Sequence, residues 1–113
     1  MTKSHKDAFR DMRRSSGKVL SQIPDVLRGY GALGKGAVQD GAVSVKNKEL
    51  IALGIAITTR CEGCIQAHVT NAIRAGASKE EMYETIGVAI LMSGGPGTVY
   101  GAKAYDVIEE FMD

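Results

Sequence analysis

The chain lacks any apolar run long enough to cross a membrane. Its longest strongly apolar segment, residues 50–57, is far shorter than the roughly 20 residues that a transmembrane helix needs. The N-terminal region has charges where a secretory signal would need an uninterrupted apolar stretch. The formal net charge is only +1, which indicates no general affinity for nucleic acid or anionic membranes. These absences predict a cytoplasmic protein with neither a nucleic-acid nor a membrane partner.

Cysteine is also scarce, because the 113 residues contain only Cys61 and Cys64. In a reducing cytoplasm, a Cys-x-x-Cys pair serves catalysis or metal binding more often than permanent cross-linking. A chain of this length forms one domain, which we expect to span residues 1–113. The charged N-terminal segment, which includes His5, is expected to form a solvated helix face.

No convincing two-residue alternation of apolar and polar side chains appears, so the sequence does not predict strands. Apolar residues recur at helical spacing instead, which predicts an all-α bundle of about six helices. We expect these helices to cover about residues 4–21, 24–35, 45–59, 61–75, 79–92 and 98–111, with loops at 36–43 and 93–97.

The second expected helix is intrinsically weak. It contains or adjoins four glycines, and each glycine in a helix interior lowers the stability of the helix by about 1 kcal/mol relative to alanine. These are Gly29, Gly31, Gly34 and Gly36. Ser44 and Ser78 are expected to cap the third and fifth helices, the latter in a capping box with Glu81.

The third and fifth expected helices are apolar on nearly every side. A helix of this kind must be buried all round, and a chain of 12.0 kDa has little room to bury two of them. We therefore expect a homo-oligomer in which these helices pack against other copies of the chain.

Four side chains with complementary chemistry occur at helical spacing. Cys61, Cys64 and His68 are three and four residues apart, which places them along one stripe of a helix. An antiparallel hairpin that turns at residues 59–60 brings Glu49 to within about one turn of the height of His68, because each residue adds about 1.5 Å. The spacing therefore predicts that the carboxylate meets the imidazole.

Each of these groups has a use in thiol chemistry. An ordinary thiol with a pKa near 8.5 is only about 3% ionised at pH 7, whereas the thiolate is the nucleophile. A helix N-terminus stabilises the thiolate, His68 can accept the Cys64 proton, and Glu49 can orient the imidazole. The second thiol can resolve a sulfenic acid into a disulfide.

Three other interpretations use the same residues. The cysteines and His68 could simply pack in a core. Cys61, Cys64, His68 and Glu49 could instead form a structural zinc site. A redox-sensing oligomer, whose disulfide changes assembly without turnover, is a further alternative.

The sequence resembles the carboxymuconolactone decarboxylase superfamily, and within it the alkylhydroperoxidase D-like branch. The segments that resemble it are residues 48–53, 61–68 and 75–81. The resemblance implies an all-helical fold, a trimer or hexamer, and thiol-dependent reduction of hydroperoxides without a cofactor or metal. It also implies re-reduction by a dithiol protein, either lipoyl-bearing or thioredoxin-like.

In that branch, Cys64 corresponds to the peroxide-reactive thiol and Cys61 to the resolving one, while Glu49 and His68 match the proton relay. One departure is that Glu62 and Gly63 stand where some members have a histidine between the cysteines. The Glu62 carboxylate should disfavour a neighbouring thiolate. The decarboxylase arm lacks the cysteine pair, so we expect an oxidoreductase, namely a thiol peroxidase or disulfide reductase.

Overall fold

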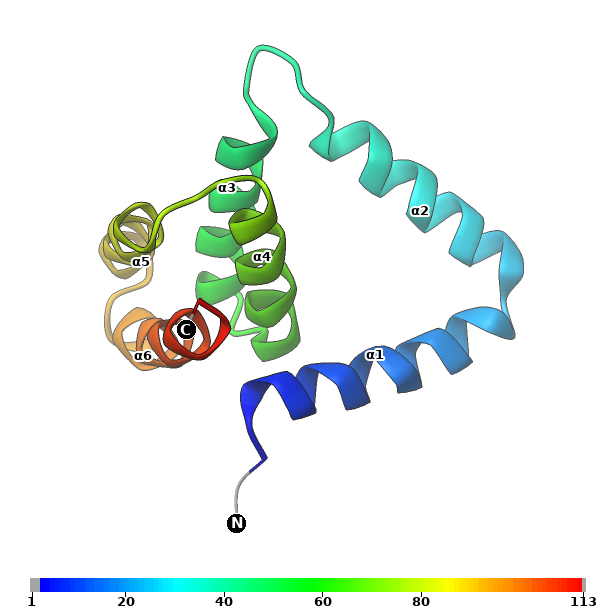
Figure 1. The fold of residues 1–113 in the computed structure, drawn as a ribbon, viewed down its shortest axis with the longest axis horizontal. Helices are drawn as coiled ribbons and strands as arrows, with labels where there is room; N and C mark the ends of the chain where they lie inside the picture. Colours follow the sequence, from blue (N-terminus) through cyan, green and yellow to red (C-terminus); the bar gives the residue numbers. More distant parts are fainter. Residues whose placement is uncertain (1–2, 113) are drawn as a thin grey trace.

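A computed structural model of the protein describes residues 3–112, which form six α-helices and no strand (Figure 1). The helices are α1 (His5–Ser21), α2 (Pro24–Val38), α3 (Val45–Thr58), α4 (Glu62–Arg74), α5 (Lys79–Ser93) and α6 (Gly95–Phe111). The predicted all-α class is therefore confirmed. No helix within residues 3–112 combines the length and the apolar character needed to span a bilayer.

Two loops are shorter than the sequence predicts. α2 continues to Val38, three residues into the segment expected as a loop. The expected break at residues 93–97 shrinks to Gly94, whose φ of 65° lies in the left-handed region that glycine adopts without strain. Pro96 lies in the first turn of α6, where its missing N–H is not needed.

Both predicted serine caps are present. The Ser44 hydroxyl accepts a hydrogen bond from the Asn47 N–H at 3.1 Å at the start of α3. At the start of α5, Ser78 and Glu81 form the reciprocal capping box. These caps fix where α3 and α5 begin, because they satisfy N–H groups that have no partner within the helix.

Helices α3, α4, α5 and α6 enclose the hydrophobic core. Leu53 and Ile57 on α3 belong to the same buried cluster as Ile65 and Val69 on α4, and all four side chains are completely buried. Burial of aliphatic side chains of this size contributes about 1.5–3 kcal/mol each. The core therefore holds α3 firmly against α4. Glu49 lies on α3, Cys64 and His68 lie on α4, and Cys61 directly precedes α4.

The first two helices lie outside this core. α1 runs across α4 and α6, whereas α2 contacts α1 and α3 and lies on the opposite side of the molecule from α5 (Figure 1). Neither α1 nor α2 contains a buried residue.

Candidate active site

The turn between α3 and α4 positions the cysteine pair. The Arg60 N–H donates to the Ile57 carbonyl at 3.2 Å, and the Cys61 N–H donates to the Ala56 carbonyl at 3.1 Å. These two bonds form a Schellman motif, in which Arg60 has a φ of 58° where glycine is the usual residue. A left-handed non-glycine residue costs about 1–3 kcal/mol, so the packing of the hairpin must hold it in place. As a result, α4 starts immediately after the turn.

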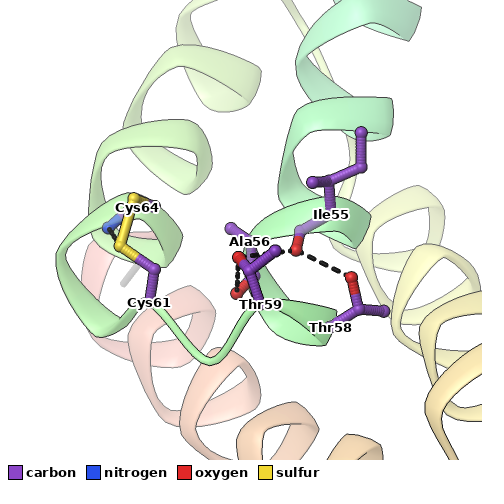
Figure 2. Close-up of a disulfide and its surroundings, with 6 residues drawn as sticks. All are labelled: Ile55, Ala56, Thr58, Thr59, Cys61 and Cys64. Atoms are coloured by element: carbon purple, nitrogen blue, oxygen red, sulfur yellow. Dashed lines mark hydrogen bonds between the residues drawn. A yellow bond between two sulfur atoms is a disulfide. The ribbon is translucent and has the colours of Figure 1, made fainter.

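Two threonine hydroxyls complete the end of α3 beside the cysteine pair (Figure 2). Thr58 donates to the Ile55 carbonyl at 2.8 Å, and Thr59 donates to the same carbonyl at 2.9 Å. The last carbonyls of a helix have no partner within it. The Ile55 carbonyl already accepts the Thr59 N–H at 2.8 Å, so the two hydroxyls add further bonds to it and reinforce the turn that carries the cysteines.

Cys61 and Cys64 are joined by a disulfide at the start of α4, with their Cα atoms 5.2 Å apart (Figure 2). Cys61 is the N-cap residue, and its Sγ accepts a hydrogen bond from the Cys64 N–H at 3.2 Å. Cys64 lies within the first turn and is exposed, whereas Cys61 is partly buried. An incoming oxidant therefore has better access to Cys64.

Glu49 and His68 make the contact that the helical spacing predicts. His68 Nδ1 lies 2.7 Å from Glu49 Oε1, across the interface between α3 and α4. Glu49 is only 4% exposed, and a carboxylate this deeply buried needs a polar partner. As the hydrogen-bond partner of a carboxylate, Nδ1 carries the proton, which leaves Nε2 of the neutral ring as an acceptor. The pair therefore orients a base on α4.

The two pairs lie one helical turn apart. His68 follows Cys64 by four residues on α4, so both side chains project from the same face of the helix. In the described part of the chain, no hydrogen bond links His68 to either sulfur. The structure thus joins Cys61 with Cys64 and Glu49 with His68, while proton transfer between the pairs stays a prediction.

His5 is not simply solvated, contrary to the sequence-based expectation. Its Nδ1 lies 3.2 Å from Nε2 of the buried Gln66 and 3.7 Å from Oε1 of Glu62, the residue after Cys61. The side chain of Met12 also approaches Gly63, where an added Cβ would lie 3.2 Å from the Met12 terminal methyl. Helix α1 therefore packs directly against the Cys-x-x-Cys turn.

A carboxylate on α6 fastens the start of α1 in this position. Glu110 accepts hydrogen bonds from the backbone N–H groups of Lys6 at 3.0 Å and His5 at 2.9 Å. These bonds, with that from Lys6 the stronger influence, hold the pKa of Glu110 below its ordinary range despite partial desolvation. A carboxylate is also favoured at a helix N-terminus by the helix dipole.

Replacing Glu62 by glutamine is expected to increase the reactivity of the reduced Cys64 thiol about twofold at pH 7. The carboxylate disfavours a nearby thiolate, but its side chain is 48% exposed and water screens the effect. The rate of alkylation of the reduced protein, measured against pH, checks this. Glu84→Gln, at an exposed position on α5, is the matched control and should leave the alkylation rate unchanged. A rate that is unchanged or lower in Glu62→Gln would contradict the prediction.

The residues of the site do not form a metal-ligand cluster. Between residues 3 and 112, no group of three or more His, Cys, Asp and Glu side chains is arranged to hold a metal ion. The zinc interpretation therefore finds no ligand set in this part of the chain.

An all-α domain with a Cys-x-x-Cys pair at the start of one helix and a histidine–carboxylate pair beside it belongs to a recognisable class. Residues 24–106 match the family model of the carboxymuconolactone decarboxylase family. The chain therefore belongs to the carboxymuconolactone decarboxylase family.

The chain is also similar to known relatives and solved structures over most of its length. An uncharacterized protein of Cupriavidus necator is 33% identical over 104 residues, which are 92% of each chain. The crystal structure of a carboxymuconolactone decarboxylase family protein from Legionella pneumophila superposes with a TM-score of 0.92 at 35% identity, covering 96% of this chain and 97% of that one. A family protein from Thermotoga maritima, whose description suggests a part in the antioxidative response, has a TM-score of 0.82 at 27% identity over 93% and 90% of the two chains.

Proposed function

We propose that this protein is a thiol-dependent hydroperoxide reductase that works through the Cys61–Cys64 pair. The observation that supports this most is the buried Glu49 carboxylate, which orients His68 one helical turn from the exposed Cys64. A core histidine that only needed a hydrogen-bond partner would not require a buried charge next to a redox-active pair.

The first step of the proposed cycle is oxidation of Cys64. Its thiolate attacks the distal oxygen of the hydroperoxide, the O–O bond breaks, and Cys64 becomes a sulfenic acid. The leaving alkoxide takes a proton and departs as an alcohol. In this proposal, His68 accepts the thiol proton before the attack and returns it to the alkoxide.

The second and third steps restore the enzyme. The Cys61 thiol attacks the sulfenic sulfur, a disulfide forms, and water leaves. An external dithiol then reduces the Cys61–Cys64 disulfide by thiol–disulfide exchange and is itself oxidised to a disulfide. The Cα separation of 5.2 Å lies within the usual range for a disulfide, so the pair can close without moving the backbone.

Family membership supports an oxidoreductase of this kind, because the family includes alkylhydroperoxidase-like members. The suggested antioxidative role of the Thermotoga maritima protein points in the same direction. A lipoyl-bearing or thioredoxin-like protein in the cytoplasm is the proposed electron donor, since each presents a dithiol.

Steady-state consumption of an organic hydroperoxide, with dihydrolipoamide as the donor, tests the proposal. We expect many equivalents of donor to be oxidised per protein chain, in proportion to the hydroperoxide added. A redox sensor would consume one equivalent and stop, and that result would favour the alternative in which the disulfide acts only on assembly.

A further inference from the structure

A cavity lies where α1, α4 and the C-terminal end of α6 come together (Figure 1). Its volume is about 340 Å³, within the range of about 300–1,000 Å³ that is usual for small-molecule sites. Ile73 lines it and follows Cys64 by nine residues, or about two and a half helical turns, so it projects from the opposite side of α4. The cavity is therefore separate from the site that contains the cysteine pair.

The floor of this cavity is apolar and continuous with the hydrophobic core. It consists of Phe9 on α1, Ile73 on α4 and Phe111 on α6, all of them partly buried. Ile73 and Phe111 pack against the buried core cluster, and the ring centroids of Phe9 and Phe111 lie 6.3 Å apart. Both phenylalanines of the chain thus line this one cavity. Such a floor favours a ligand with an apolar body, because binding removes both apolar surfaces from water.

The rim of the cavity is positively charged. Lys6 and Arg10 on α1 and Arg74 at the end of α4 line it, and within the described part of the chain no carboxylate does. Arg10 also contacts Asp7 at 3.2 Å, so its charge is partly compensated. Lys6 and Arg74 form no ion pair with any other side chain between residues 3 and 112. A cleft lined by charges of one sign concentrates ions of the opposite sign, so this rim favours an anion.

We propose that this cavity binds a small amphipathic carboxylate. Its apolar body lies against the two phenylalanines and Ile73, and an aromatic body suits them best, because aromatic pairs gain more than their area alone provides. The carboxylate lies at the rim, where the Lys6 ammonium and the Arg74 guanidinium can donate charge-assisted hydrogen bonds to it.

The volume of the cavity limits the size of this ligand. A water molecule occupies about 30 Å³ in the liquid, so 340 Å³ corresponds to about eleven waters and suits a molecule of about ten to thirteen non-hydrogen atoms. A carboxylate with a short arylalkyl body has this size, whereas a membrane lipid is several times larger. The inference concerns a second binding site and does not depend on the proposed peroxidase activity.

Calorimetric titration of the full chain with 4-phenylbutyrate tests the site. We expect one molecule per chain with a Kd on the order of 0.1–1 mM, which a ligand of about twelve non-hydrogen atoms can reach. The neutral analogue 4-phenylbutan-1-ol should bind about tenfold more weakly, because it lacks the charge that the rim attracts. Acetate, which has the charge without the apolar body, should show no binding at about 10 mM.

Substitutions locate the ligand in this cavity. The double variant Lys6→Gln with Arg74→Gln removes two exposed charges of the rim and should weaken 4-phenylbutyrate about tenfold while leaving 4-phenylbutan-1-ol unaffected. Lys18→Gln, an exposed change of the same kind on α1 but outside the cavity, is the matched control and should bind like the wild type. Thr70→Phe fills the cavity from α4 and should abolish the binding of both compounds, with circular dichroism showing that the variant is folded. The double variant changes no buried side chain, so it tests the site even if Thr70→Phe does not fold.

Several results would overturn the proposal. If 4-phenylbutyrate did not bind at about 10 mM, the cavity would not be a site for such a carboxylate. Equal affinity for 4-phenylbutan-1-ol would mean that the cations play no part, and unchanged affinity in the double variant or in folded Thr70→Phe would place the ligand elsewhere. Vesicles of phosphatidylglycerol should not bind the protein. Vesicle binding that the double variant abolished would mean that Lys6 and Arg74 face a membrane surface instead.

Discussion

The Cys64→Ser variant is expected to lose hydroperoxide consumption by at least about 10³-fold. Serine keeps nearly the size of the side chain but has no thiol, so no sulfenic acid can form at position 64 and no disulfide can form with Cys61. The measurement is donor-coupled hydroperoxide loss under steady-state conditions. Residual turnover within tenfold of the wild type would show that Cys64 is not the reactive thiol.

Cys61→Ser is the matched control, because it removes the other sulfur of the same pair. It should still consume one equivalent of hydroperoxide and then stop with a sulfenic acid on Cys64, which a dimedone adduct detected by mass spectrometry would reveal. If the adduct appeared on Cys61 in the Cys64→Ser variant instead, the roles of the two thiols would be exchanged.

The exposure of the two sulfurs gives these roles a physical basis. Cys64 is exposed, whereas Cys61 is partly buried and caps α4 by accepting the Cys64 N–H. A nucleophile must reach its substrate, while a resolving thiol need only reach its neighbour. The N-terminus of α4 favours negative charge near both, but only Cys64 combines this with access to solvent.

The contact between Glu49 and His68 could be predicted from the sequence because it depends on local geometry. Both residues belong to one helical hairpin, and a fixed rise per residue converts their distance from the turn into a height along each helix. The caps at Ser44 and Ser78 were predictable for the same reason, since capping involves residues only three positions apart. For residues that are close together in the sequence, the spacing between them is enough to predict which side chains meet.

The position of His5 could not be predicted in this way. It contacts Glu62 and Gln66, which are more than 50 residues away, and Glu110 on α6 holds the backbone there. Such contacts depend on how α1 crosses α4, and no local pattern encodes that crossing. A mixed charge pattern is typical of a solvent-exposed helix face. At His5, however, the packing of α1 against α4 brings the side chain into contact with Gln66 and Glu62.

The length of α2 illustrates a different limit. Its glycines predict a weak helix that ends near residue 35, whereas the structure extends it to Val38. Intrinsic propensity is a weak predictor of where a helix ends, because the difference between residues is only about 1 kcal/mol or less.

Substitutions in the Glu49–His68 pair are expected to lower hydroperoxide turnover by about 10²-fold, the usual range for an acid–base group. His68→Ala removes the base that accepts the Cys64 proton. Glu49→Gln leaves the base in place but removes the carboxylate charge that orients it. Pre-steady-state rates of sulfenic acid formation over a range of pH would measure both effects at the step concerned.

The double variant, which combines Glu49→Gln with His68→Ala, shows whether the two residues act as one relay or independently. If Glu49 acts only through His68, then Glu49→Gln should have little further effect in a His68→Ala background, and the two losses should not add. Glu84→Gln, an exposed change of the same chemical kind on α5, should leave the rate unaltered. His68→Ala also leaves the buried Glu49 carboxylate without its partner, so this variant should unfold more easily than Glu49→Gln, which removes the buried charge itself. Losses that multiply, or equal stability of the two single variants, would mean that carboxylate and imidazole act separately.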